Sequence, residues 1–331
     1  MARTFLLLQL KRVGDVLLCT PIIRAIRAHE PECRIVFVTE GANEPILRAN
    51  PRLDAVVTLP ARMGIGDWCA LRARLRHERA DIAIDFSGTP RSCIITALAG
   101  ASTRLGFRVR APRRWLYNRL VVPNLDTYTV DRRLDLLRAI GIPDRGFAPE
   151  IHLDDADRRE ARRLLDVVGF ATGGPIVAIA PTSRRNAKRW SADGFARAGA
   201  WARGRIGGEI LLLFGPGEEE QVEEVRRLIP GGARRLRGMP GLRAAAALIE
   251  RSRVVIANDG GLKHIAVALG VPTVTVFVST GPAGWHPPNE PLHAAIIARG
   301  DVEAEVGEVC AAIDMILGAG SPPASGDERT R

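Results

Sequence analysis

One segment in the C-terminal half combines residue types that bind anions. Val254–Ala257 is an apolar run that predicts a buried strand, and Asn258-Asp259-Gly260-Gly261 then turns into a helix that begins at Leu262. Glycines let backbone N–H groups approach phosphate oxygens, and a helix N-terminus carries about half a positive charge. Lys263 and His264, in the first helical turn, add side-chain donors. Two interpretations stay open, a diphosphate site or a tight turn in which Asp259 only caps the helix.

Two further loops of this half follow predicted strands. Strand Ile176–Ala180 leads into a basic loop with Thr182, Ser183 and Lys188, and strand Thr273–Val278 leads into a glycine-bearing loop that ends at Trp285. Ligands of open α/β sheets bind beyond the carboxyl ends of the strands, so these loops are expected to meet. Lys188 is one of three lysines among 47 basic residues, which favours function over the alternative of a solvated basic loop.

The elements that must position these loops alternate between short apolar runs and longer segments of helical periodicity, as in βαβ units around a parallel sheet. Further predicted strands are Phe5–Leu10, Arg34–Val38, Ala55–Leu59, Asp81–Phe86, Glu209–Phe214 and Arg253–Ala257. Predicted helices are Val16–His29, Asp67–His77, Pro90–Leu98, Asp131–Ile140, Asp154–Val168, Ser191–Ala202, Glu218–Leu228, Leu242–Glu250, Leu262–Leu269 and Val302–Leu317. We therefore predict an α/β chain with two doubly wound parallel-sheet domains, residues 1–170 and 171–317, and a disordered tail over 318–331.

Composition limits the possible partners. The 331 residues carry a net charge of +10, which favours nucleic acid, an anionic membrane face or phosphorylated small molecules. The five cysteines form no CxxC pair and no Cys/His cluster, so neither a disulfide framework nor a zinc site is predicted, and a reducing cytoplasm fits best. The apolar run Thr4–Leu10 is too short for a signal or a membrane span. No GxGxxG follows the first strand, which argues against an NAD enzyme.

At the motif level the chain resembles glycosyltransferase family 9, the ADP-heptose:lipopolysaccharide heptosyltransferases. Asp259-Gly260-Gly261-Leu262-Lys263-His264 is similar to the family's Asp-Thr/Ser-Gly-Leu/Pro-x-His turn, and Ala268–Thr273 reads Ala-Leu-Gly-Val-Pro-Thr as in the family. Lys188-Arg189-Trp190 resembles its Lys-x-Trp motif, and Gly14-Asp15-Val16 its Gly-Asp-Val opening. Gly260 departs from the family's hydroxyl residue, and Tyr128 stands where the family usually has His.

The resemblance implies a GT-B fold, in which two Rossmann-like domains face a cleft, and it implies roles for individual residues. Asp15 is expected to be the catalytic base, with helix capping as the alternative role. The implied donor-binding residues are Thr182, Ser183, Lys188, Glu218, Asp259, Gly260, Gly261, Leu262, Lys263 and His264. The implied acceptor-binding residues, in the N-terminal domain, are Arg12, Ser87, Arg91 and Arg108. No metal and no cofactor are expected.

The resemblance further implies inverting transfer of a heptose or related sugar from ADP-heptose to an anionic lipopolysaccharide inner core. The enzyme would be cytoplasmic, with peripheral contact at the inner face of the inner membrane, and would bind no nucleic acid. Two alternatives remain. The departures at Gly260 and Tyr128 leave room for a soluble natural-product or protein acceptor, and the +10 charge leaves room for a non-catalytic nucleotide or RNA binder.

Overall fold

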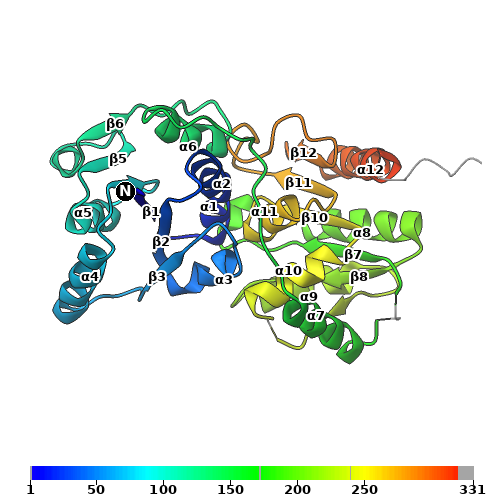
Figure 1. The fold of residues 1–331 in the computed structure, drawn as a ribbon. Helices are drawn as coiled ribbons and strands as arrows, with labels where there is room; N and C mark the ends of the chain where they lie inside the picture. Colours follow the sequence, from blue (N-terminus) through cyan, green and yellow to red (C-terminus); the bar gives the residue numbers. More distant parts are fainter. Residues whose placement is uncertain (1, 171–172, 239, 320–331) are drawn as a thin grey trace, which may run out of the picture. The chain divides into compact units, whose positions relative to one another are not determined.

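A computed structural model describes residues 2–170, 173–238 and 240–319 (Figure 1). The chain divides into two compact units, residues 1–154 and 155–331, and each contains one six-stranded sheet in which every strand pair is parallel. No helix in the described part of the chain is long and apolar enough to span a bilayer. Of the tail that was expected to be disordered, residues 320–331 lie outside the described residues.

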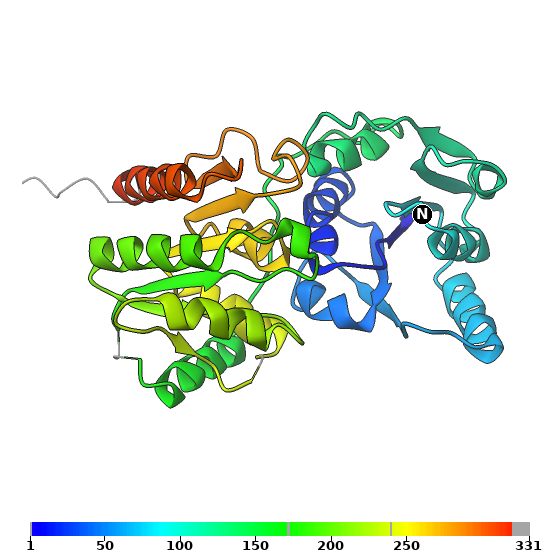
Figure 2. The ribbon, with the colours of Figure 1, turned by 180° about the vertical axis from the view of Figure 1, so that it is seen from behind.

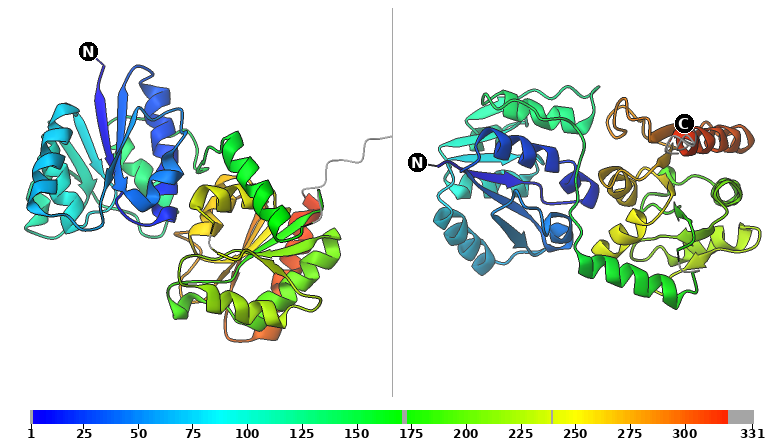
Figure 3. Two further views of the ribbon diagram at one scale, coloured as in Figure 1. Left: turned by 90° about the horizontal axis from the view of Figure 1, so that it is seen from below. Right: turned by 45° about the vertical axis from the view of Figure 1, so that its right-hand side comes forward.

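The first unit is a doubly wound sheet with the strand order β3-β2-β1-β4-β5-β6. Its strands are β1 (Thr4–Leu8), β2 (Arg34–Glu40), β3 (Ala55–Leu59), β4 (Ile82–Asp85), β5 (Thr103–Phe107) and β6 (Arg119–Val121). Its helices are α1 (Val13–Leu17), α2 (Thr20–His29), α3 (Glu44–Leu47), α4 (Ile65–His77), α5 (Pro90–Ala99) and α6 (Thr129–Arg138), with 3-10 turns η1 (Gly41–Asn43) and η2 (Arg113–Leu116). Helices α4 and α5 pack on one face, and α2 and α6 lie together on the other (Figure 3).

The second unit repeats this topology, with the strand order β12-β11-β10-β7-β8-β9. Its strands are β7 (Ile176–Ala180), β8 (Glu209–Leu212), β9 (Arg234–Arg235), β10 (Val254–Asn258), β11 (Thr273–Phe277) and β12 (His293–Ile297). Its helices are α7 (Asp155–Val167), α8 (Ala192–Ile206), α9 (Glu219–Leu228), α10 (Leu242–Glu250), α11 (Gly261–Ala268) and α12 (Val302–Ala319), with the 3-10 turn η3 (Asn186–Lys188). Helices α8, α9 and α12 cover one face (Figure 2), and α7, α10 and α11 cover the other.

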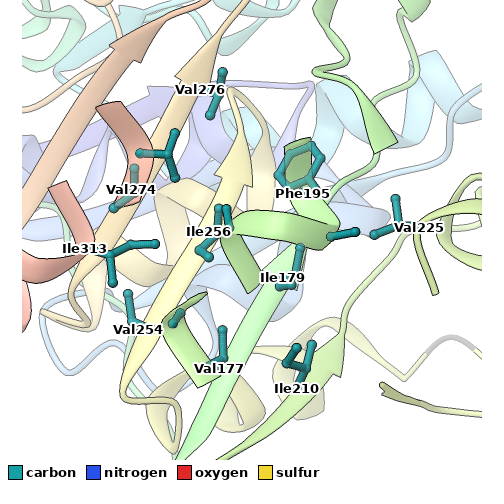
Figure 4. Close-up of a cluster of buried hydrophobic side chains, with 14 of the residues drawn as sticks. Val177, Ile179, Phe195, Ile210, Val225, Val254, Ile256, Val274, Val276 and Ile313 are labelled. Carbon is teal, nitrogen blue, oxygen red and sulfur yellow. The ribbon is translucent and has the colours of Figure 1, made fainter. Parts of the chain in front are cut away.

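The core of the second unit explains why its strands read as apolar runs. Alternate residues of neighbouring strands, such as Val254 and Ile256 of β10, point to one face, where Phe195 of α8 and Ile313 of α12 pack against them (Figure 4). The other residues of β10 are equally buried, because helices cover both faces. Helix α8 is bounded by local signals: Ser191 accepts a hydrogen bond from the Gly194 N–H, and the helix ends at a left-handed glycine.

The prediction of two Rossmann-like parallel sheets is confirmed. The single helix predicted over Val16–His29 is wrong: it divides into α1 and α2, and Pro21, which lacks an N–H, lies in the first turn of the second helix. Strands β5, β6, β9 and β12 were not predicted, since they are short or carry arginines and alanines. Helix α7 packs against α10, and its Arg158 forms an ion pair with Glu250 at 2.9 Å, so the contacts divide the chain before α7.

Candidate active site

The predicted donor residues gather at the carboxyl edge of the second sheet. The loops after β7 and β10 leave the sheet on either side of the point where the strand order reverses, which is where ligands of open α/β sheets bind. The loops after β8 and β11 flank them. Side-chain hydrogen bonds join all four loops. Loop residues that are far apart in the sequence therefore form one connected cluster.

Asp259 lies at the centre of this cluster and is 7% exposed. Its Oδ2 accepts a hydrogen bond from the Lys188 Nζ at 2.7 Å and another from the Thr280 Oγ1 at 3.1 Å. Helix α11 begins after Gly260 and receives no side-chain capping hydrogen bond. The capping interpretation of Asp259 therefore does not describe this structure: its carboxylate joins the loops after β7 and β11 instead.

Lys263 is the second lysine of the cluster, but its side chain is completely buried. Its Nζ donates a hydrogen bond to the Trp285 carbonyl oxygen, lies 4.0 Å from the Asp259 Oδ1 and is 5.5 Å from the centre of the Phe277 ring. Burial lowers the pKa of Lys263 to about 7, although the Asp259 carboxylate partly opposes the shift. These contacts fasten the loop after β11 to helix α11, whereas Lys188, with 17% of its side chain exposed, keeps access to solvent.

Thr182 and Glu218 connect the loops after β7 and β8. The Thr182 Oγ1 donates to the Glu218 Oε2 at 2.5 Å, and the same oxygen accepts from the Gly215 N–H at 2.7 Å. The neighbouring Ser183 N–H donates to Gln221 at 3.4 Å. Glu218 therefore shapes two loops through one carboxylate oxygen and does not cap its own helix.

The remaining predicted donor residues belong to the start of α11. Gly260 has an extended backbone, with φ at −156°, and a Cβ placed there would find its nearest neighbour at 3.8 Å. The backbone conformation and the space around the Cβ therefore do not require glycine at this position. Gly261 and Leu262 are partly exposed in the first turn, and His264 is buried with its ring 6.1 Å from that of Trp285 in an edge-on contact.

Two histidines, the half-buried His286 and the buried His293, lie near Lys263 and stay neutral at neutral pH. Burial, together with nearby positive charge, lowers the pKa of both His286 and His293 to about 4; the charge is that of Lys263 for His286, and that of His286 and then Lys263 for His293. The His286 Nε2 and the His293 carbonyl oxygen are 3.1 Å apart. Neutral imidazoles of this kind support the loop after β11 and leave Lys188 and Lys263 as the cations of the cluster.

The first unit places Asp15 in the first turn of α1, beyond β1 and next to the reversal of strand order between β1 and β4. The Arg133 Nη2 lies 3.1 Å from the Asp15 Oδ1, and the Nη1 donates to the Asp15 carbonyl oxygen at 2.5 Å. Helix α1 has no side-chain cap, so Asp15 does not act as one. The buried Arg133 guanidinium orients the carboxylate, of which 19% remains exposed.

The loop after β4 is built around the buried Asp85. Its Oδ1 accepts from the Ser87 and Gly88 N–H groups at 2.8 and 3.2 Å, and its Oδ2 accepts from the Tyr117 hydroxyl at 2.6 Å. Burial raises the pKa of Asp85, while these hydrogen bonds oppose the shift. The Ser87 Oγ is buried and finds no hydrogen-bond partner among the described residues.

The predicted acceptor arginines differ in their surroundings. Arg91 forms an ion pair with Glu40 at 2.9 Å and donates to the Pro60 and Ala61 carbonyls, so its guanidinium is already occupied. Arg108 and Arg12 are exposed. Arg12 has a φ of 68°, a left-handed conformation that is uncommon outside glycine and indicates a constrained turn after β1.

Sequence reasoning missed Arg133, Asp85 and Thr280 as members of the two sites. The sequence did contain a sign that Arg133 is buried, because it lies with Val130, Leu134 and Leu137 on the apolar face of its helix. A buried arginine on such a face needs an anionic partner. Nothing in the sequence identified Asp15 as that partner, because 118 residues separate the two.

The chain matches one protein family and several known proteins. Residues 68–311 match the model of glycosyltransferase family 9 (heptosyltransferase). Lipopolysaccharide heptosyltransferase 3 of Escherichia coli (strain K12) is 27% identical, over 83% of this chain and 82% of the relative.

Two solved structures share the fold. A family 9 glycosyl transferase from Veillonella parvula DSM 2008 has a TM-score of 0.84 at 20% identity and covers 96% of this chain and 98% of its own. E. coli ADP-heptose lps heptosyltransferase II has a TM-score of 0.80 at 22% identity, covering 96% and 99%. Because the family model spans most of the sequence, the chain belongs to glycosyltransferase family 9, the heptosyltransferases.

Proposed function

We propose that this enzyme transfers a heptose from ADP-heptose to an anionic lipopolysaccharide inner-core acceptor, with inversion and without a metal ion. The observation that carries the proposal is the cluster of Lys188, Asp259 and Thr280 at the strand-order reversal of the second sheet. The names of the relatives, which are lipopolysaccharide and ADP-heptose lps heptosyltransferases, support the choice of donor and acceptor. In this proposal the second unit binds the donor and the first unit binds the acceptor.

In the proposed reaction the acceptor hydroxyl oxygen attacks the anomeric carbon of the heptose. Asp15 takes the proton of that hydroxyl, and the bond between the anomeric carbon and the diphosphate oxygen breaks, so that ADP leaves with the electron pair. Arg133 keeps the Asp15 carboxylate oriented. Lys188 and the N–H groups at the start of α11 oppose the negative charge that develops on the diphosphate.

The proposed donor site also gives Asp259 a role other than direct contact with the diphosphate. A carboxylate repels a diphosphate, yet Asp259 fixes Lys188 in position at 2.7 Å. With both lysines protonated, the group of Lys188, Lys263 and Asp259 has a net charge of +1. This charge attracts an anionic donor, and only Lys188 of the two lysines reaches the solvent.

The test of the base is the transfer rate of the wild type and Asp15→Asn in EDTA, with ADP-heptose and a lipopolysaccharide inner core. We expect Asp15→Asn to lower kcat by about 10²–10⁴, because general base catalysis contributes about that much. Asp144→Asn, which alters an exposed partner of Arg138 in the same unit, serves as the control and keeps its rate. Full activity of Asp15→Asn would remove Asp15 as the base, and loss of wild-type activity in EDTA would contradict metal independence.

The test of the donor site is thermal shift with ADP and other nucleoside diphosphates, since a ligand that binds the native state raises its stability. We expect ADP to stabilise the wild type and to lose this effect in Lys188→Met. Arg253→Met, at the amino end of β10 and thus at the opposite edge of the sheet, serves as the control. A soluble acceptor that is glycosylated while lipopolysaccharide is not would overturn the acceptor assignment.

A further inference from the structure

One segment of the first unit combines arginines with exposed apolar side chains, and apart from Arg108, an expected acceptor residue, it is not explained by the proposed active site. We define the 108–125 surface as the exposed residues Arg108, Arg110, Arg114, Trp115, Arg119, Leu120, Val122 and Leu125. Trp115 and Leu125 are each 69% exposed, and Val122 is 66% exposed. Large apolar side chains so exposed and so close in the sequence are typical of interaction sites.

The charge around these side chains has a single sign. From Phe86 to Leu125 the chain contains seven arginines and no aspartate or glutamate. Among the described residues, no ion pair neutralises Arg108, Arg110, Arg114 or Arg119, whereas many arginines elsewhere in the molecule, such as Arg24, Arg158 and Arg205, face a carboxylate. The Arg114 guanidinium lies 5.9 Å from the centre of the Trp115 ring, so the charge and the aromatic surface are presented together.

This surface is built from the edge of the first sheet. Strand β6 is the edge strand, and the Arg108 N–H donates to the Val121 carbonyl at 2.8 Å, which places Arg108 beside the start of the exposed apolar segment. Two contacts join the region to the loop after β4. Arg113 donates to the Gly88 carbonyl at 2.7 Å, and Tyr117 donates to Asp85 at 2.6 Å. The 108–125 surface is thus connected to the loop that carries Ser87, a proposed acceptor residue.

We infer that the 108–125 surface docks on a lipid bilayer that carries anionic headgroups. Arginines attract the negative surface potential, while tryptophan and aliphatic side chains enter the boundary between the headgroups and the acyl chains. The functional purpose of this docking, bringing the acceptor loop to a membrane-borne glycolipid, rests on the proposed function. The docking itself rests on the side chains and is tested without any acceptor.

Other occupants fit these side chains less well. RNA would satisfy the arginines but offers no apolar phase for Val122 and Leu125. A second copy of the chain, pairing the same surface with itself, would oppose arginines to arginines without a single carboxylate between residues 86 and 125.

The experiment is co-sedimentation of the full chain with vesicles of phosphatidylcholine alone and of phosphatidylcholine mixed with phosphatidylglycerol. We expect binding to the anionic vesicles that weakens as salt is raised. Arg110→Gln/Arg114→Gln should weaken that binding by about twenty-five-fold, about five-fold for each arginine near the membrane surface. Trp115→Ser/Val122→Ser should weaken it several-fold because apolar contact with the bilayer is lost.

The second unit supplies a matched control. Trp201 is also exposed, at 45%, and Arg205 lies 5.7 Å from the centre of its ring, but Arg205 is paired with Asp314 at 2.7 Å. Trp201→Ser should bind the anionic vesicles as the wild type does. All variants should keep the wild-type thermal shift with ADP, which shows that they are folded. Failure of sugar transfer with intact vesicle binding would refute the proposed function alone.

Three results would overturn the inference. The first is equal vesicle binding by the wild type and both double variants, and the second is equal weakening by Trp201→Ser. The third is the absence of vesicle binding by the wild type together with a dimer, or an RNA complex, that Trp115→Ser/Val122→Ser abolishes. Ultracentrifugation and a gel shift with a single-stranded RNA measure these two complexes.

Discussion

The fully buried Lys263 makes the stability of the second unit depend on pH in a way that one substitution should remove. Lys263→Met keeps a long unbranched side chain in the same space but carries no charge. The substitution loses the hydrogen bond to the Trp285 carbonyl and the proximity of the ammonium to Asp259. It also removes a cation that the protein buries at a cost.

The size of this pH effect on the free energy of unfolding follows from the pKa of Lys263, which is about 7, against 10.5 for an ordinary lysine. Between these two values the unfolded chain binds more protons than the folded one, so stability rises with pH. From about pH 6 to about pH 9 the wild type should gain about 3 kcal/mol from this group, because about two pH units of difference in protonation separate the folded and unfolded states. The pKa values of His286 and His293 are lowered from 6.5 to about 4, so these residues add a separate gain in stability between about pH 4 and about pH 7, which both the wild type and Lys263→Met should show.

The assay is urea unfolding at these two pH values, followed by the tryptophan fluorescence of the chain, to which the buried Trp190 of the second unit contributes. In Lys263→Met the part of the gain that comes from Lys263, about 3 kcal/mol, should be absent. The control is Lys11→Met, because 70% of the Lys11 side chain is exposed, and its stability should follow the wild type across the range. Parallel pH profiles for the wild type and Lys263→Met, to within about 0.5 kcal/mol, would refute the assignment of this titration to Lys263.

Three further substitutions test local geometry by thermal unfolding. Gly260→Thr should change stability by less than about 1 kcal/mol, since a Cβ there meets nothing closer than 3.8 Å; a loss above about 2 kcal/mol would contradict the space seen at this turn. Gly208→Ala should cost about 3 kcal/mol or more, because its Cβ would lie 2.2 Å from the Pro175 carbonyl oxygen, and near-neutral stability would show that the backbone can shift. Trp190→Phe should cost about 1–3 kcal/mol by leaving the buried Glu305 carboxylate without its 2.7 Å donor; an unchanged melting temperature would argue against that hydrogen bond.

Much of the fold followed from local patterns. Strands β7, β10 and β11 are buried on both faces, so their apolar runs are visible in the sequence, and helix α10 was predicted with the bounds that it has. The edge strands β6 and β9 were not visible. They have three and two residues and contain arginines, and their pairing depends on a neighbouring strand that is already in place.

The residues of the candidate site show the same difference between features that are local in the sequence and features that depend on folding. Asp259, Lys188 and Glu218 were predicted as site residues because they follow apolar strands and match family motifs, and both signals are local in the sequence. Their partners were not recognised, since Thr280 meets Asp259, and Arg133 meets Asp15, only after the chain has folded.

The sequence by itself determined the fold class, the family motifs and the loops that carry the polar residues, because apolar periodicity and glycine-bearing turns depend on neighbours along the chain. The tertiary structure alone decided what each charged group does. Lys188 and Lys263 look alike in the sequence, yet one keeps access to solvent beside Asp259 and the other is buried under Phe277. The physical reason is that burial and the distance to a counter-charge are set by packing between distant segments, and these two quantities control both the pKa of a lysine and its access to a ligand.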